Sequence, residues 1–168
     1  MTERPQGFVI GKKQPKPQPP PRKRSLPAPE CEIDPPANRG AEACVYICGC
    51  DLLCPIVSEA NNTDHWTVKR KRKDAQKIEV NARMSHLPIA TLAKHQLLIR
   101  IIRIGGRKMD GDNYQTAVKA VRDSIASQLR PGLAPGQADS TDQFSWDYHQ
   151  QSGKPKRIRI EFWKRIPI

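Results

Sequence analysis

Two aspartates separated by one glycine and followed at once by an asparagine form the run Asp110-Gly111-Asp112-Asn113. Mg²⁺ is held by hard oxygen ligands, usually one or two carboxylates together with waters and substrate phosphates. The glycine lets the backbone turn tightly, so both carboxylates can point at one ion. Asn113 can cap a following helix or orient a carboxylate through its amide. The run therefore predicts a metal site, with a surface turn as the simpler alternative.

Further polar residues follow this run at helical spacing. Asp112, Lys119 and Asp123 are separated by seven and then four positions, which places them on one face of a helix. A lysine beside metal-bound carboxylates can hold a phosphate or stabilise charge as a bond breaks. Two more acids, Asp139 and Asp142, lie in a Gly/Pro/Asp-rich loop after this helix. They extend the proposed site with further oxygen ligands.

The surrounding pattern indicates how these residues are positioned. The segment 95–106, HQLLIRIIRIGG, is apolar on both faces, as is typical of a strand at the centre of a sheet. It ends just before the acidic run, and open sheets place ligands beyond the end of a central strand. A helix is predicted over 114–129. Shorter strands are predicted over 43–50, 143–151 and 157–163. The expected fold class is α+β, one domain with a mixed sheet flanked by helices.

The charge balance points to a polyanionic partner. The net charge is +12 and the pI is near 9.8, and nucleic acid is the commonest polyanion that such a surface meets. A helix predicted over 66–83 carries five consecutive cations, Lys69 to Lys73, with Lys77 one turn later. A solvated helix surface is the alternative, but mutual repulsion among adjacent cations favours a polyanion contact.

The N-terminal part has a different composition. Residues 1–26 are rich in Pro, Lys and Arg, and residues 30–39 are rich in Pro and acids. We expect residues 1–40 to form a disordered basic tail and linker, and residues 41–168 to form the folded domain. No apolar region of a signal peptide follows the first charges, and no stretch reaches the roughly 18 apolar residues of a membrane span. A cytoplasmic protein without membrane contact is expected.

Four cysteines, Cys44, Cys48, Cys50 and Cys54, lie within eleven residues. Structural zinc sites usually pair cysteines two to four residues apart in two knuckles separated by a longer loop. Here no second knuckle follows, and all four positions are even-numbered, so on a strand they would share one face. Buried thiols are therefore predicted in preference to a zinc site.

Together these features resemble the RusA-type Holliday junction resolvases, a family common in phages and prophages. The likeness runs from Val45 to Phe162, and the family pattern is D-x-D-N, then a helical Lys, then an Asp in a loop before the next strand. The segment KAVRDSI (119–125) and the Asn61-Asn62 to Trp66 element before a basic helix look similar to the phage branch. The compact family pattern has its Lys four residues after the second Asp, where Thr116 stands here. Lys119 lies one helical turn later.

The resemblance implies a homodimeric, Mg²⁺-dependent endodeoxyribonuclease, with Mn²⁺ able to substitute, in a bacterial or phage-infected cell. Its substrate would be branched DNA: a four-way junction cut by two paired incisions, with flaps and forks as alternatives. Metal ligands would be Asp110, Asp112 and Asp142 (alternatively Asp139), Lys119 would be catalytic, and Asn113 and Asp123 would support them. DNA contacts are expected from Asn62, Lys69, Arg70, Lys71, Arg72, Lys73, Lys77, Arg107 and Lys108. A non-catalytic nucleic-acid-binding protein and a zinc-dependent adaptor are the rival hypotheses.

Overall fold

The computed structural model describes residues 42–54, 56–58, 63–134 and 136–167. The expected tail and linker (1–40) and Asn62 lie outside the described residues. The strands are β1 (Glu42–Leu52), β2 (Leu97–Gly105), β3 (Phe144–Ser152) and β4 (Arg157–Pro167). The helices are α1 (Trp66–Met84), α2 (Ile89–Leu92), α3 (Gly111–Ala117) and α4 (Lys119–Leu129), with a 3-10 turn over Ala138–Ser140. The expected α+β class is confirmed.

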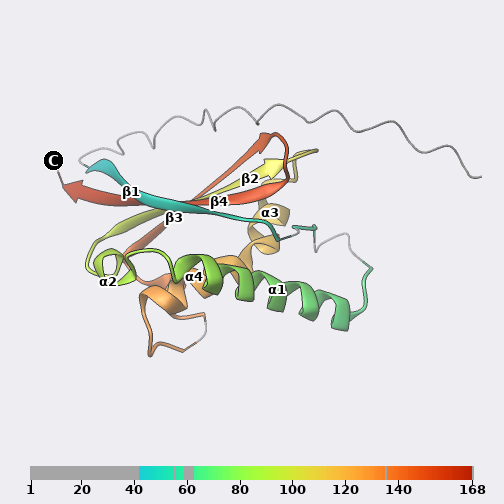
Figure 1. The fold of residues 1–168 in the computed structure, drawn as a ribbon, viewed down its shortest axis with the longest axis horizontal. Coiled ribbons are helices and arrows are strands. Elements are labelled where there is room, and N and C mark those ends of the chain that lie inside the picture. The colour runs from blue at the N-terminus through green and yellow to red at the C-terminus, as the bar shows by residue number, and fades with distance from the viewer. Residues whose placement is uncertain (1–41, 55, 59–62, 135, 168) are drawn as a thin grey trace, which may run out of the picture.

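The four strands form one mixed sheet in the order β1-β4-β2-β3 (Figure 1). β2 runs parallel to β3, from Leu97 opposite Phe144 to Gly105 opposite Ser152, and antiparallel to β4. β1 is also antiparallel to β4. The ends of β1, β2 and β3 and the start of β4 therefore share one edge of the sheet, which we call the carboxyl edge.

β2 is the centre of the packing, as its apolar pattern predicted. Eight of its nine residues are buried, and it is hydrogen-bonded to a strand on each side. The helices gather on one face of the sheet (Figure 1). There Ile99 and Ile101 of β2 pack in one cluster with Val80 of α1 and Val121 of α4. Each such fully buried side chain contributes about 1.5 to 3 kcal/mol.

α1 lies across this core and leaves most of its surface exposed. Its first turn is capped by His65, whose ring accepts a hydrogen bond from the backbone N–H of Thr67 at 3.4 Å. Only Gln76, Val80 and Met84 of the helix are buried. Within the described residues, no helix combines the length and apolar character needed to cross a membrane.

A buried ion pair lies on the opposite face of the sheet. Arg100 of β2 is 3% exposed, and its Nε donates to Oδ2 of Asp147 on β3 at 3.0 Å. The guanidinium also lies 5.9 Å from the ring centroid of Trp163 on β4. His149 contacts the same carboxylate oxygen at 2.9 Å. The pair thus links the three neighbouring strands β3, β2 and β4.

The predicted helix over 114–129 is instead two helices. α3 begins earlier, at Gly111, and the break falls at Val118, which has φ −99° and ψ 5°. The backbone N–H of Val118 still donates to the carbonyl of Tyr114 at 3.0 Å. Val118 is fully buried, so packing of its side chain offsets the cost of leaving helical geometry.

The expectation that the four cysteines share one face was wrong for Cys44. A register irregularity between Tyr46 and Cys48 changes the alternation along β1. Cys44 lies opposite Arg165, on the face without the helices, whereas Cys48 and Cys50 lie opposite Phe162 and Ile160 of the core. All four are free thiols, and burial raises the pKa of Cys50 to about 11. Cys48 and Cys50 act as small apolar residues at the edge of the core.

Replacement of Asp147 with Ala should destabilise the fold by about 2 kcal/mol, because it removes the β3 carboxylate that accepts a hydrogen bond from the buried Arg100. Burial alone would raise the pKa of Asp147, but the hydrogen bonds and charges of His149 and Arg100 lower it below its ordinary value. Its contribution is therefore complete above about pH 4 and is lost as the pH falls through the lowered pKa.

Urea unfolding of wild type and Asp147→Ala at pH 7 and pH 3 measures both effects. The difference between the two proteins should shrink at the lower pH. Asp74→Ala removes an exposed aspartate of α1 and serves as the control, with an expected change within about 0.5 kcal/mol. Equal stabilities of Asp147→Ala and wild type at pH 7 would contradict the assignment.

Candidate active site

A pair of facing side chains anchors the loop that leads into the acidic run. Arg103 of β2 and Gln150 of β3 are register partners, and Arg103 Nη1 lies 3.3 Å from Gln150 Oε1. Gln150 accepts from the Met109 N–H at 2.9 Å and donates to the Met109 carbonyl at 2.7 Å. Arg103 donates to the Arg107 carbonyl at 2.9 Å. The backbone from Arg107 to Met109 is thereby fixed to two strands, one residue before Asp110.

Asp110 and Asp112 follow this anchored loop with their side chains in solvent. Asp110 is the N-cap residue of α3, and Asp112 lies in the first turn. Both are exposed, and within the described chain the Asp110 carboxylate makes no helix-capping hydrogen bond. Asn113 Nδ2 instead donates to Asp110 Oδ2 at 3.5 Å. Of the two predicted roles for Asn113, the structure shows the one that orients a carboxylate.

The next charged residues form a network around Arg122. Its guanidinium contacts Asp139 Oδ2 at 2.9 Å and Asp123 Oδ1 at 3.9 Å. Lys119 Nζ lies 3.2 Å from the same oxygen of Asp123, and the Tyr148 hydroxyl lies 3.4 Å from Arg122. Burial alone would lower the pKa of Arg122, but Tyr148 and the two carboxylates raise it. Lys119, Asp123 and Asp139 are therefore brought together.

The structure does not join this network to the acidic run through side chains. Between Asp112 and the pair of Lys119 and Asp123, no hydrogen bond or ion pair occurs in the part of the chain that is described. The break at Val118 separates them, so the predicted alignment of all three on one helix face holds only for Lys119 and Asp123.

The two candidates for the third acid lie in different surroundings. The Asp139 side chain is 7% exposed and paired with Arg122, and its backbone carbonyl accepts from Trp146 Nε1 at 3.0 Å. Asp142 is exposed and precedes the first residue of β3 by two positions. Since β2 and β3 are parallel, Asp142 lies at the opposite edge of the sheet from the end of β2.

The described residues contain no group of three Asp, Glu, His or Cys side chains close enough to hold a metal ion. Asp110 and Asp112 are thus not joined by Asp139 or Asp142 in this arrangement. A metal held here would take two protein carboxylates, which is within the usual range for Mg²⁺.

The carboxyl edge is rich in cations around the acidic run. Arg107 and Lys108 are exposed in the anchored loop, as the sequence led us to expect. Lys154, Lys156 and Arg157 reach the same edge from the β3–β4 turn and the start of β4. Sequence reasoning missed these three, because only the pairing of β4 beside β2 places that turn next to Gly105, at the end of β2.

The basic face of α1 forms a second cationic surface. Trp66, which is 63% exposed, lines a shallow groove together with Lys69, Arg70, Lys73, Asp74 and Lys77. Arg70 lies 3.9 Å from Asp74 within this groove. Lys71 is also exposed, but Arg72 turns inward and pairs with Asp64, with its side chain 9% exposed. Lys69, Arg70, Lys73 and Lys77 are thus available together, and Arg72 is engaged within the fold.

Sequence reasoning also missed Gln150, Arg103 and Arg122 as site residues. Gln150 follows Trp146 and Tyr148 on the same face of β3, and its polar side chain after two aromatic ones was the available signal. The polar residue indicates an anchoring role only once the parallel pairing of β2 and β3, which puts Gln150 beside Arg103, is known.

Comparison of the chain with protein-family models, curated proteins and solved structures finds no match.

Replacement of Gln150 with Ala should release the loop before Asp110, because both hydrogen bonds to the Met109 backbone are lost. Each neutral hydrogen bond contributes about 1 kcal/mol, so the Met109 amide should exchange its hydrogen about ten times faster or more. Hydrogen exchange followed by NMR measures this directly. Gln128→Ala removes a side-chain amide bonded to Asn81 elsewhere and should leave the Met109 rate unchanged. An unchanged rate in Gln150→Ala would refute the anchor.

The two candidate third acids should differ in their effect on stability. Asp139→Asn removes the partner of Arg122 in a largely buried pair and should cost about 2 kcal/mol. Asp142→Asn changes an exposed side chain and should stay within about 0.5 kcal/mol of wild type. Urea unfolding of both variants tests this. Equal destabilisation by the two changes would show that the Asp139–Arg122 pair does not hold the loop.

Proposed function

We propose that this chain is a Mg²⁺-dependent endonuclease that cuts branched DNA. One observation carries the proposal: two exposed carboxylates, Asp110 and Asp112, follow a loop that is anchored to two strands and carries two exposed cations. Anchoring matters because a catalytic group must be held close to its working position by rigid elements. The resemblance to RusA-type resolvases centres on the same residues.

The chemistry of this donor set fits a hard divalent cation. Asp110 and Asp112 would hold Mg²⁺ through carboxylate oxygens, with Asn113 orienting Asp110. When bound, Mg²⁺ activates a water molecule and stabilises the charge on the leaving oxygen. The third acid of the family pattern does not join this pair within the described chain, because Asp142 lies at the opposite edge of the sheet and Asp139 is paired with Arg122.

Lys119 is the proposed phosphate-binding residue. Its side chain is exposed, and Asp123 Oδ1 lies 3.2 Å from its ammonium group. Asp123 would limit the positions that this ammonium can take before a phosphate arrives. Arg122 in turn contacts Asp123, so the position of Lys119 depends on Arg122 as well.

The two cationic surfaces are the proposed DNA contacts. Arg107 and Lys108 beside the acidic run would bind the phosphates nearest the cut, and the α1 face would bind an arm of the branch. Such contacts release counterions, so affinity should fall steeply with salt. A homodimer with two-fold symmetry would suit a four-way junction, which presents two equivalent strands.

A non-catalytic nucleic-acid-binding protein is the second candidate. It is favoured by the lack of a third acid beside Asp110 and Asp112 among the residues that the structure describes. In that case both carboxylates would only repel phosphate, and their removal would tighten binding.

Changing Asp110 to Asn separates the two functions. If the chain is the proposed nuclease, the variant should lose Mg²⁺-dependent cleavage of a synthetic four-way junction at least about a hundredfold. Junction binding in EDTA should be retained, because the change removes a negative charge. Wild-type cleavage should stop in EDTA and return with Mg²⁺ or Mn²⁺. Forked and flapped DNA assayed in parallel would identify the preferred branch.

Glu79→Gln is the matched control, since it removes the same charge from α1, outside the basic groove and away from the acidic run. It should cut at the wild-type rate or faster. A wild-type protein that binds the junction but cuts no branched DNA with either metal ion would refute the proposal and support the second candidate.

A further inference from the structure

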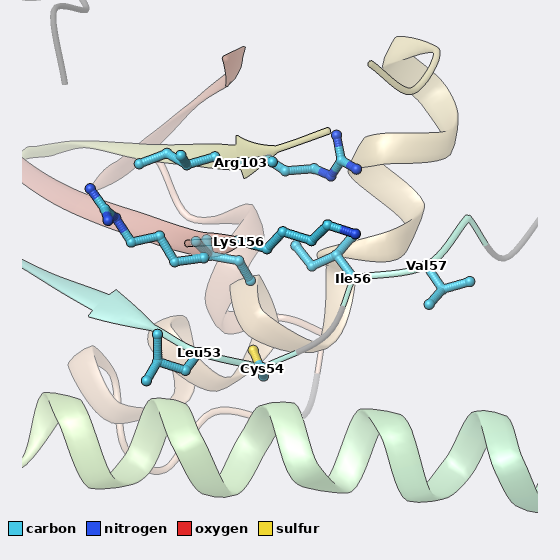
Figure 2. A pocket seen from close by; sticks show the side chains of 10 residues that line it. Leu53, Cys54, Ile56, Val57, Arg103 and Lys156 are labelled. Carbon is cyan, nitrogen blue, oxygen red and sulfur yellow. The ribbon is translucent and has the colours of Figure 1, made fainter. Parts of the chain in front are cut away.

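A pocket of about 380 Å³ opens at the carboxyl edge (Figure 2). Its walls come from the segment after β1, the end of β2 and the start of β4. Figure 2 shows Leu53 and Cys54 on the side nearest α1, with Arg103 and Lys156 extending from the sheet. Its volume lies within the range of small-ligand sites, about 300 to 1,000 Å³.

One side of the pocket is apolar although it faces solvent. Leu53 is 62% exposed and Val57 is 39% exposed, and Ile56 and Cys54 line the space between them. Burial raises the pKa of Cys54 to about 11, so its thiol remains protonated at neutral pH and adds to the apolar wall. Exposed aliphatic side chains grouped around a hollow indicate a ligand with a flat apolar part.

The other side is cationic. Arg103, Lys156 and Arg157 line the pocket, and none of the described residues in its lining is acidic. The nearby Asp51 pairs with Arg157 at 3.2 Å and with Arg159 at 3.0 Å, which leaves Lys156 to face the pocket. An anion attached to the apolar part of a ligand would satisfy this side.

The pocket and the acidic run share structural parts. Arg103 lines the pocket and also donates to the Arg107 carbonyl, and Gly105 lines it at the end of β2. A chain of phosphates crossing the carboxyl edge would therefore pass both the pocket and Asp110. A nucleotide combines a base, whose flat faces are apolar, with a phosphate, and so matches both the apolar and the cationic side of the pocket.

We propose that this pocket receives one unpaired nucleotide of the DNA strand, next to the phosphate at Asp110 and Asp112. The inference deepens the proposed function and rests on it for the identity of the substrate. The base lies against Leu53, Ile56 and Val57, and Lys156 and Arg103 bind the adjoining phosphate. A fork supplies such a nucleotide at little cost in free energy, because a base on its single-stranded arm is already unpaired.

The test uses the full chain and forked DNA, in EDTA so that no cutting occurs. In one set of forks, 2-aminopurine replaces each unpaired base next to the branch in turn; in a second set, the same position is abasic. Wild type should raise 2-aminopurine fluorescence at one position by taking the base out of its stack. The fork that is abasic at that position should bind about tenfold more weakly, as expected when one base loses its contact with the apolar wall.

Two pairs of variants place the effect in the pocket. Leu53→Asp puts a carboxylate into the wall and should abolish the fluorescence change, whereas Leu133→Asp makes the same change at another exposed leucine and should not. Lys156→Gln should weaken binding about fivefold and lower the salt dependence by about one phosphate contact. Lys94→Gln removes an exposed lysine before the start of β2, at the opposite edge, and should have little effect. Thermal unfolding confirms that each variant is folded.

The outcomes separate this inference from the nuclease. If folded Leu53→Asp and Lys156→Gln keep the fluorescence change and affinity of wild type, or if abasic forks bind like intact ones, the pocket inference is overturned. Cleavage of forked DNA by wild type in Mg²⁺ would then still support the nuclease. If wild type never cuts but the four variants behave as expected, the pocket stands as a nucleotide-binding site and the nuclease fails.

Discussion

The parallel pairing of β2 with β3 determines which side chains of this protein can meet. β2 is buried on both faces and hydrogen-bonded on both sides, so contacts in every direction fix its position. A parallel partner brings the end of β3 to the end of β2, and only then does Gln150 lie beside Arg103. These two side chains hold the backbone that precedes Asp110. An antiparallel β3 would put Phe144 at that edge and leave the loop without its anchor.

The strongest local patterns predicted the elements, but not how they meet. The doubly apolar run of β2 indicated a central strand, and the alternation of 157–163 indicated β4, because burial acts on each strand separately. The cations Lys154, Lys156 and Arg157 could not be assigned to the site in this way. Their place depends on pairing between segments more than fifty residues apart, which no local pattern contains.

Two local predictions failed at positions where the backbone leaves regular strand or helix geometry. Even-numbered cysteines predicted one face of a strand, but the irregularity after Tyr46 turned Cys44 to the face without the helices. Helical spacing predicted that Asp112 and Lys119 share a face, but the helix is interrupted between them at the buried Val118. In both cases the regular period failed where one residue left regular geometry, and a single sequence carries no sign of such a position.

The surroundings of Asp110 and Asp112 differ from those of several other aspartates in the chain. Several aspartates of this strongly basic chain are engaged by cations: Asp51, Asp64, Asp123, Asp139 and Asp147. Such pairs hold loops and strands together. Asp110 and Asp112 instead point into solvent at an edge lined by cations, where they weaken attraction for a polyanion. An edge that bound DNA by charge alone would gain nothing from them. A divalent cation bound by both carboxylates would reverse their effect, because it would turn two repelling groups into a site that attracts a phosphate.

Arg103 contacts both the loop before Asp110 and the pocket at this edge. One end of the guanidinium holds the loop before Asp110, while the same side chain lines the pocket between β2 and the segment after β1. A phosphate near Asp110 and a base in the pocket would therefore be positioned by one residue on the most buried strand of the fold. Contact of one β2 side chain with both proposed subsites would limit their relative motion. A small misplacement of a reacting group is costly to catalysis. The central strand thus serves the proposed chemistry more directly than the helices that cover it.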